Sequence, residues 1–349
     1  MQVKFNPGMA PSTVDSSNFT VTGPFGQEAA QVTFDSSTNT ATWVTYPPQT
    51  GQSGVPLAMA SNYTATISGL TGGPYSFSFQ TGPCGPVYPA TYQMYDVPNA
   101  FNTYLYGINE NGVVTGRYDT STGDYGFILD HGQLTSLNII GYKINDSNAV
   151  VGVLNKVPGA QPTPVALEDA YLYQDGQYIN VNPPNSNAPP DQNWAYGINN
   201  AGVIVGYYVI NQSGTGQIQK TSGFVRQAGG SYQDIQQVPM GINNLGHIAG
   251  QTNNASWIYI NGVYNNLVVP GCSDVSAEGI NDSDDTVGYA AVCNWPNLSG
   301  AYVKRGGNAY QVVVPGCVYV RAEDIKNNGV IVGMCSNEKG SHGFIGTPN

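Results

Sequence analysis

The chain has 349 residues and a net charge of −11, and charged residues make up only 9% of it, against about 25% in an average soluble protein. With 11 basic side chains against 22 acidic ones, it cannot build the positive surface that nucleic-acid binding requires, and no apolar run approaches the roughly 20 residues that span a bilayer. Hydrophobic residues amount to 40%, enough for a folded core, which argues against intrinsic disorder.

The first 82 residues show the short alternating runs of an all-β domain. Met1 leads directly into the first run, without the apolar stretch of a signal peptide, so a secreted protein would be represented here by a mature form or a fragment. Strands are predicted at Val3–Phe5, Phe19–Gly23, Ala30–Phe34, Thr40–Thr45, Asn62–Ser68 and Tyr75–Gln80.

Several segments in this region share their order and spacing with a known family: Val3–Met9, Ser12–Val14, Ser17–Gly23, Asn39–Trp43, Tyr63–Ile67 and Ser76–Gly82. Residues 1–82 thereby resemble the bacterial Ig-like domains that act as spacers in secreted and surface proteins, which implies a β-sandwich. That family has one or two further strands before the position of Val3–Phe5. The domain is therefore expected to be truncated or to be completed by another chain. Residues 83–90 are predicted to be a Pro-rich linker.

Residues 91–349 are a repeat array, in which six copies of one motif recur about every 43 residues, the length of a four-stranded propeller blade. Each copy predicts two strands joined by an Asn/Asp-rich turn, and a small residue before an aromatic marks a third strand. The copies are Gly107–Gly116, Lys143–Gly152, Gly197–Gly206, Gly241–Gly250, Gly279–Gly288 and Asp324–Gly333.

The two ends of the array complement each other. The chain stops just after the third strand of the sixth unit, and an unassigned strand, Tyr92–Pro98, precedes the first unit. We predict that residues 92–97 pair with the strand containing Gly343–Ile345, which closes a six-bladed β-propeller and removes both sheet edges. The segments Ser341–Phe344 and Asp124–Phe127 resemble the His-Ala-Phe signature that gives the bacterial HAF-repeat proteins their name. That resemblance implies a secreted or envelope protein of unassigned activity, and it supplies no catalytic motif.

The six residues that precede the Gly-Ile-Asn positions are expected to surround the propeller axis at one end of its central channel. Tyrosines on one arc and glutamates on the other are suited to holding a sugar by stacking and hydrogen bonds; packing between blades, with the glutamates capped by backbone donors, is the alternative. The predicted ligand-binding residues are Tyr106, Tyr142, Tyr196, Met240, Glu278 and Glu323, together with Trp194 and Trp295.

The longer loops are predicted to share one face of the ring, where binding surfaces usually develop. They lie at Leu154–Asp169, Asn182–Asn193, Ile210–Ser222 and Cys293–Asn297.

Catalytic and metal-binding motifs are absent from the sequence. Glu278 and Glu323 are the one pair of carboxylates that we nominate as candidate acid and base of a glycosidase. The stretch Asn281–Asp285 resembles part of a calcium loop but lacks its Gly and distal Glu, so a solvated turn is expected. We expect no cofactor and no metal.

Two disulfides are predicted among the five cysteines, Cys272–Cys293 and Cys317–Cys335, with Cys84 left free. In an antiparallel hairpin the numbers of facing residues have a constant sum, and Cys272 and Cys293 satisfy the sum set by the turn at Asp282–Ser283. For Cys317 and Cys335 the sum of the residue numbers is three less than the sum expected for the sixth unit. Both bridges imply an oxidising compartment.

These features predict a non-catalytic extracellular or cell-surface module for adhesion, glycan binding or envelope structure. Two alternatives remain open: a polysaccharide-active enzyme that uses the loop-rich face, and a filament or surface-layer subunit assembled by strand addition at the Ig-like domain. A glycan or another envelope protein is the expected partner, with neither nucleic-acid binding nor membrane insertion.

Overall fold

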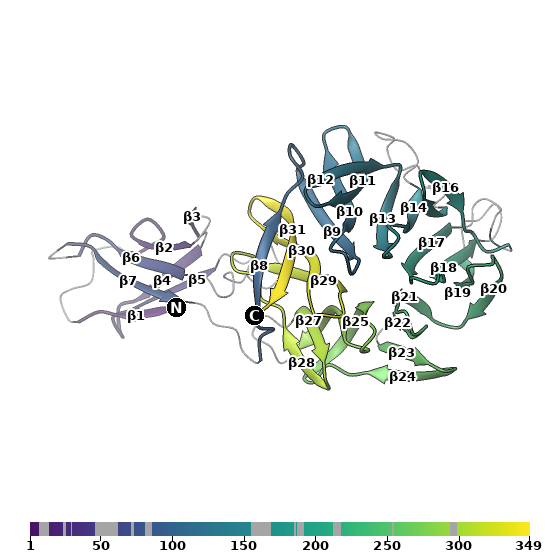
Figure 1. The fold of residues 1–349 in the computed structure, drawn as a ribbon. Coiled ribbons are helices and arrows are strands. Elements are labelled where there is room, and N and C mark those ends of the chain that lie inside the picture. Colours follow the sequence, from purple (N-terminus) through teal and green to yellow (C-terminus); the bar gives the residue numbers. More distant parts are fainter. Residues whose placement is uncertain are drawn as a thin grey trace. The chain divides into compact units, whose positions relative to one another are not determined.

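The structure is a computed structural model that describes residues 1–6, 14–23, 26–28, 30–45, 62–70, 73–80, 86–154, 169–184, 186, 192–211, 218–252, 255–293 and 299–349. Every regular element in these ranges is a β-strand, and the strands form small antiparallel sheets (Figure 1). No helix that could cross a membrane occurs in the described part of the chain. The chain divides into two compact units, Met1–Cys84 with Val313–Val318, and Gly85–Val312 with Tyr319–Asn349.

The first unit contains two sheets that enclose one core. All six predicted strands are confirmed to within one residue at either end, and the two-residue strand β3 is an addition. Buried side chains alternate along the central strands and include Phe19, Trp43 and Tyr63. One sheet has the order β1-β5-β4 (Gln2–Lys4, Thr40–Thr45, Ala30–Asp35), and the other has the order β3-β2-β6-β7 (Gly26–Gln27, Phe19–Gly23, Asn62–Ile67, Tyr75–Gln80).

The second unit contains six four-stranded antiparallel sheets. In each, the first strand ends at the isoleucine of the repeat motif, and the second strand follows the turn. The first five sheets are β9–β12 (Asn102–Ile108, Val114–Thr120, Gly123–Asp130, Gln133–Leu137), β13–β16 (Ile139–Ile144, Val150–Leu154, Ala170–Gln174, Gln177–Asn180), β17–β20 (Gln192–Ile198, Ile204–Asn211, Ile218–Arg226, Tyr232–Ile235), β21–β24 (Val238–Ile242, Ile248–Gln251, Ser256–Ile260, Val263–Leu267) and β25–β28 (Cys272–Ile280, Thr286–Cys293, Ser299–Arg305, Asn308–Gln311).

The sixth sheet joins the two ends of this unit. It consists of β29 (Tyr319–Ile325), β30 (Ile331–Asn337), β31 (Gly340–Pro348) and, as its outer strand, β8 (Ala90–Tyr95). In Figure 1 the blue strand β8 lies beside the yellow β31. The register pairs Tyr95 with Gly343 and Gln93 with Ile345. The predicted pairing of the early strand with the C-terminal one is therefore confirmed.

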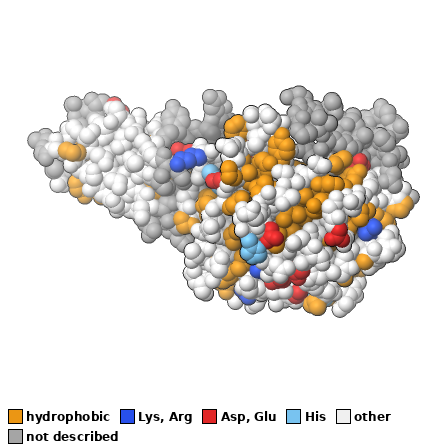
Figure 2. All heavy atoms as spheres, turned by 45° about the horizontal axis from the view of Figure 1, so that its top comes forward, with side chains coloured by type: hydrophobic (Ala, Val, Ile, Leu, Met, Phe, Trp, Pro, Cys, Tyr) orange, Lys and Arg blue, Asp and Glu red, His pale blue; other side chains and the backbone are white. Residues whose placement is uncertain are grey.

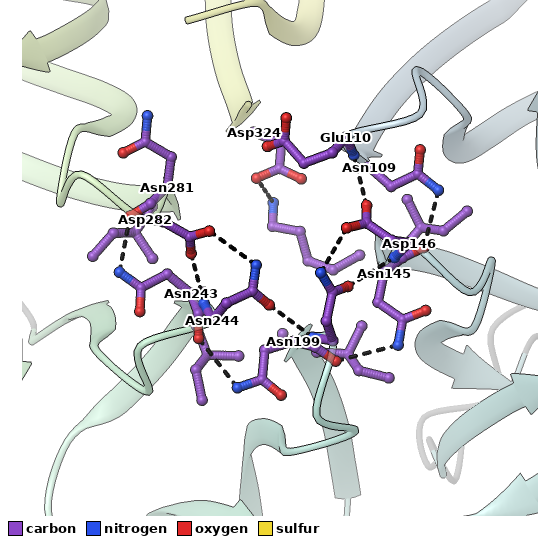
Figure 3. A pocket seen from close by; sticks show the side chains of 18 of the residues that line it. Asn109, Glu110, Asn145, Asp146, Asn199, Asn243, Asn244, Asn281, Asp282 and Asp324 are labelled. Atoms are coloured by element: carbon purple, nitrogen blue, oxygen red, sulfur yellow. Dashed lines mark hydrogen bonds and ion pairs between the residues drawn. The ribbon is translucent and has the colours of Figure 1, made fainter. Parts of the chain in front are cut away.

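Hydrogen bonds between successive motifs run in a closed cycle. In each motif, the backbone N–H of the residue after the Asn position donates to a side-chain oxygen of its equivalent in the next motif, at 2.7 to 2.9 Å. The cycle passes through Glu110, Asp146, Asn200, Asn244, Asp282 and Asn327 and returns to Glu110. Figure 3 labels four of these side chains, Glu110, Asp146, Asn244 and Asp282, around one narrow cavity, and all six motifs contribute to its lining. The six motifs therefore surround a common axis.

The asparagine of the motif holds both its own turn and the neighbouring one. The side-chain oxygen of Asn109 accepts a hydrogen bond from the backbone of Val113, four residues later, and its amide nitrogen donates to the Asn145 carbonyl. Asn145, Asn199, Asn243 and Asn281 repeat this arrangement. Asn is used here because it offers an acceptor and a donor on one short side chain.

Four of the five cysteines fall late in the sequence, in the last two sheets of the second unit and in the segment Val313–Val318. Cys272 and Cys293 face each other in the register of β25 and β26, as the predicted index sum requires, and Cys272 is disulfide-bonded. Cys317 and Cys335 are also disulfide-bonded, although Cys335 faces Val320 in the strand register. The full pairing stays a prediction, and Cys84 lies outside the described residues.

Candidate functional site

All six sheets of the second unit share an irregularity at the same position. On the first strand of each, one residue is skipped by the ladder, so that its neighbours pair with consecutive residues of the second strand. Such a bulge turns the extra side chain out of the regular alternation, and bulges are enriched beside functional sites. The six bulged residues are Tyr106, Tyr142, Tyr196, Met240, Glu278 and Glu323.

Glycine on the second strand makes room for each bulge. A Cβ atom placed on Gly206 would collide with the backbone oxygen of Trp194, and one on Gly288 would collide with that of Ser276. In both cases the oxygen belongs to the residue two positions before the bulge. Gly116, Gly152, Gly250 and Gly333 meet the equivalent oxygen in their own sheets. The glycine that ends the sequence motif is therefore required by the close approach of the bulged strand.

The bulged side chains meet at a cavity of about 310 Å³. The structure thus brings together all six residues that the sequence analysis placed at the mouth of the ring. Three further residues line the cavity, Lys143, Gln251 and Arg321. Trp194 is not in the lining, and Trp295 and most of the long loops lie outside the described residues.

One guanidinium connects the two glutamates of the cavity. A nitrogen of Arg321 donates to Oε1 of Glu278 at 2.7 Å, and the Arg321 Nε lies 3.3 Å from Oε1 of Glu323. The Ser276 hydroxyl donates to the same Glu278 oxygen at 2.7 Å. Both glutamates are buried. Their partners are thus side chains, where the packing alternative expected backbone donors.

Burial dominates the electrostatics of this cluster. It raises the pKa of Glu323 from an ordinary value of 4.5 to about 7; Arg321 opposes this rise and the nearby Glu278 charge adds to it. The same ion pairs, led by that with Glu323, raise the pKa of Arg321 and keep it protonated. Burial also raises the pKa of Tyr106 to about 12, so its hydroxyl keeps its proton. The cavity therefore combines a fixed positive charge with a carboxyl that titrates near neutrality.

A second ion pair lies next to the cavity on the axis. Lys143 and Asp324 take the first position of their motifs, where the other four copies have glycine. Their charged atoms are 3.8 Å apart. The Lys143 Nζ donates to the carbonyls of Tyr106 at 2.9 Å and Glu323 at 2.6 Å, while Asp324 accepts from the Ile108 N–H at 3.0 Å. Lys143 lines both this cavity and the narrower one of Figure 3.

The tyrosines of the cavity belong to a stack of aromatic rings. Tyr142 and Tyr196 stack with centroids 4.7 Å apart, and Tyr106 lies 5.7 Å from Tyr142 at a tilt of 53°. Tyr196 stacks in turn on Tyr207 at 5.7 Å, and Tyr207 on Trp194 at 4.5 Å. The ring faces of Tyr196 are thus engaged by neighbouring rings, so this residue offers a ligand its edge and hydroxyl instead of the open face expected from the sequence.

The three histidines lie outside this cavity, each against an aspartate. His131 contacts Asp130, His247 contacts Asp284, and His342 contacts Asp96. Among the described residues, no group of three or more His, Cys, Asp or Glu side chains is arranged to hold a metal ion.

Sequence analysis missed Arg321 and Lys143. A signal for each was present: Arg321 lies two residues before Glu323 on one strand, where side chains share a face, and Lys143 stands at a position that is glycine in four copies.

Comparison with known proteins gives no family for this chain. No protein-family model matches it, and no curated protein matches it. Among solved structures, an acylaminoacyl peptidase of Pyrococcus horikoshii is similar, with 10% identity and a TM-score of 0.38 over 88% of this chain and 47% of that one. This chain thus spans less than half the length of that protein, and a likeness at this TM-score carries no argument about fold or function.

Proposed function

We propose that this chain is a non-catalytic, extracellular carbohydrate-binding module. In this proposal residues 1–82 form an Ig-like sandwich, residues 91–349 form a six-bladed propeller of the HAF-repeat type, and the cavity among the bulged residues holds the sugar. The closed cycle of hydrogen bonds through six motifs supports the propeller. The observation that carries the function is the convergence of six bulged side chains on one cavity.

The chemistry of the cavity favours an uncharged, hydroxyl-rich ligand. Tyrosine hydroxyls, the Gln251 amide and charged groups supply donors and acceptors, as polyols require, and the aromatic rings supply apolar edges. The guanidinium of Arg321 is already matched by two carboxylates, and Lys143 by Asp324. On the face of the molecule in Figure 2, charged side chains are few among hydrophobic and other uncharged atoms. An anionic or cationic ligand would therefore have to displace an existing ion pair.

The same ion pairs argue against the glycosidase alternative. A glycosidase places two carboxyl groups on opposite sides of the bond to be cleaved, with room between them for sugar and water. Here Glu278 and Glu323 share the guanidinium of Arg321, which occupies the space between them. Binding without cleavage is the better match to this geometry.

An oxidising compartment agrees with the proposal. Cys272, Cys317 and Cys335 are disulfide-bonded, and such bonds persist mainly in secreted and surface proteins.

The test is a glycan array followed by calorimetry on the glycan that binds. The variant Tyr142→Ala should lose at least tenfold in affinity, because it removes a ring and a hydroxyl from the cavity wall. Tyr125→Ala is the matched control, since Tyr125 is also a half-buried tyrosine stacked on another, Tyr118, but lies outside the cavity. The unchanged protein should release no reducing sugar. Glycan cleavage that Glu323→Gln abolishes would establish the enzyme instead, and an array without binding would refute the proposal.

A second candidate, assembly by strand addition, is favoured by one feature of the first unit. The strands β1 and β7 each lie at an edge of their sheet, and a groove of about 480 Å³ between them is lined by apolar side chains that include Val3, Leu70 and Phe77. Tyr75, at the start of β7, is 57% exposed. A strand from a second copy would cover this groove. Light scattering that shows only monomers at the highest soluble concentration would eliminate this candidate.

A further inference from the structure

The aromatic stack extends beyond the cavity at both ends, and at one of them Tyr104 stacks on Tyr106 with ring centroids 6.1 Å apart. From Tyr196, which lines the cavity, it continues through Tyr207 to Trp194, both of them outside the lining. Trp194 and Tyr207 face each other across β17 and β18, and Tyr196 stands two residues after Trp194 on β17. All three side chains are half-buried. A line of partly exposed rings thus leads away from the cavity along one sheet.

The two ends of the stack differ. At the Tyr104 end, the guanidinium of Arg117 lies 4.5 Å above the ring centroid and in turn pairs with Asp124 at 3.9 Å. At the Trp194 end, the last ring has Tyr207 on one side, and the described residues provide no second ring or cation for the indole. Within the described part of the chain, the stack therefore has a cation over its Tyr104 end and neither a ring nor a cation over the outer face of Trp194.

We propose that Trp194 is the platform of a second sugar subsite, which extends the cavity into a site for an oligosaccharide chain. This inference rests on the proposed function, because the first sugar occupies the cavity. The apolar face of a pyranose ring stacks on an indole, and Trp offers the largest such surface of any side chain. Tyr207 holds the indole by a contact of 4.5 Å at 23°, so little side-chain freedom is lost on binding.

The charge of the surroundings distinguishes a glycan from single-stranded nucleic acid. Bases also stack on exposed aromatic rings, but nucleic-acid sites add a positive groove that follows the phosphates. Trp194, Tyr196 and Tyr207 are uncharged, and the chain as a whole carries −11. A neutral oligosaccharide, whose sugar rings can stack on these side chains, therefore matches this surface, whereas a polyanion does not.

The test compares short with long ligands on the full chain. The probes are cello-, xylo-, malto- and chito-oligosaccharides of two to six units, with affinity measured by calorimetry. For the series that binds, affinity should rise at least tenfold from the shortest to the longest member. In Trp194→Ala this rise should disappear while affinity for the disaccharide stays unchanged, and Trp194→Tyr should restore part of it.

Tyr259→Ala is the control, because Tyr259 is half-buried and packed on Tyr264 but belongs to another sheet, β21–β24.

A series that binds without any dependence on length would overturn the second subsite and leave the proposed function standing. Loss of disaccharide affinity in Trp194→Ala would also overturn it, since it would place the indole in the first subsite. Absence of binding by every oligosaccharide would overturn the proposed function and the subsite together. Tighter binding of the homopolymer poly(U) than of any oligosaccharide would overturn the assignment to carbohydrate.

Discussion

At the scale of single residues, the binding properties of the cavity depend on the positions of its six bulged side chains and on the charged groups beside them. Comparison of the repeats is sufficient to identify these six positions, because each directly precedes one copy of the repeat motif. It did not identify the pairing of Arg321 with Glu278 and Glu323, which joins neighbouring sheets and depends on how the bulges aim the side chains. Sequence spacing fixes a position on a strand, whereas ion pairs between strands of different sheets require the tertiary arrangement.

Glu323 makes the stability of the protein depend on pH. Burial raises its pKa from 4.5 to about 7, so between these values the folded protein holds a proton that the unfolded chain has released. Stability therefore falls as the pH rises through this window, by at most about 1.4 kcal/mol per pH unit.

The variant Glu323→Gln imitates the protonated side chain and should remove this dependence. We expect its melting temperature to match that of the unchanged protein near pH 4.5 and to exceed it increasingly up to about pH 7, beyond which the difference stays constant. Thermal unfolding at a series of pH values measures this. Glu338→Gln, at an exposed turn position, is the control for the loss of one carboxyl charge. A difference for Glu323→Gln that stays constant with pH would show that this carboxyl does not titrate in the window.

At the scale of the strand, all six repeats share a bulge on the first strand and a glycine on the second strand that makes room for it. The sequence predicts the two strands and the turn of each motif, since alternation and the Asn signal are local properties. It does not reveal the bulge, because nothing in the pattern says that one residue is skipped by the ladder. The reason for the glycine at the end of the motif is the backbone carbonyl that approaches it, and this approach is visible only in the structure. The two-residue strand β3 was missed because it is too short to show a period.

Gly288 tests this account of the bulge. In Gly288→Ala the new Cβ would collide with the backbone oxygen of Ser276, so β25 would have to shift away at the bulge that aims Glu278. We expect a loss of about 1–3 kcal/mol in the free energy of unfolding, measured by urea denaturation, together with weaker glycan binding. Gly229→Ala is the matched control, because a Cβ there meets nothing within 4 Å. If both variants were equally stable, the bulge would tolerate a side chain and the glycine would lack this role.

At the scale of the whole second unit, closure depends on contacts between the ends of the array. The pairing of β8 with β31 could be predicted from the sequence, because the sixth unit lacks a fourth strand and one unassigned strand precedes the first unit. The cycle of hydrogen bonds through Glu110 and Asn327 could not be predicted in the same way. It joins residues 217 positions apart, and its geometry exists only once all six sheets surround the axis. Tyr88 adds to the closure by donating to the Gly329 carbonyl at 2.7 Å.

Two truncations that differ by residues 85–95, which contain both β8 and Tyr88, test whether this segment joins the two ends of the array. A chain that begins at Gly85 keeps β8, and one that begins at Asp96 loses it, while both lack the first unit's N-terminal residues and Cys84 equally. Without β8, the residues Gly343–Pro348 of β31 lose their partners on one side, and an unpaired edge of this length promotes association. Size-exclusion chromatography should show a monomer for the longer chain and aggregates for the shorter. Adding a peptide of residues 90–97 should return the shorter chain to the monomer. A shorter chain that is monomeric and melts at the same temperature as the longer one would mean that the cycle of hydrogen bonds among the motifs holds the six sheets together without β8.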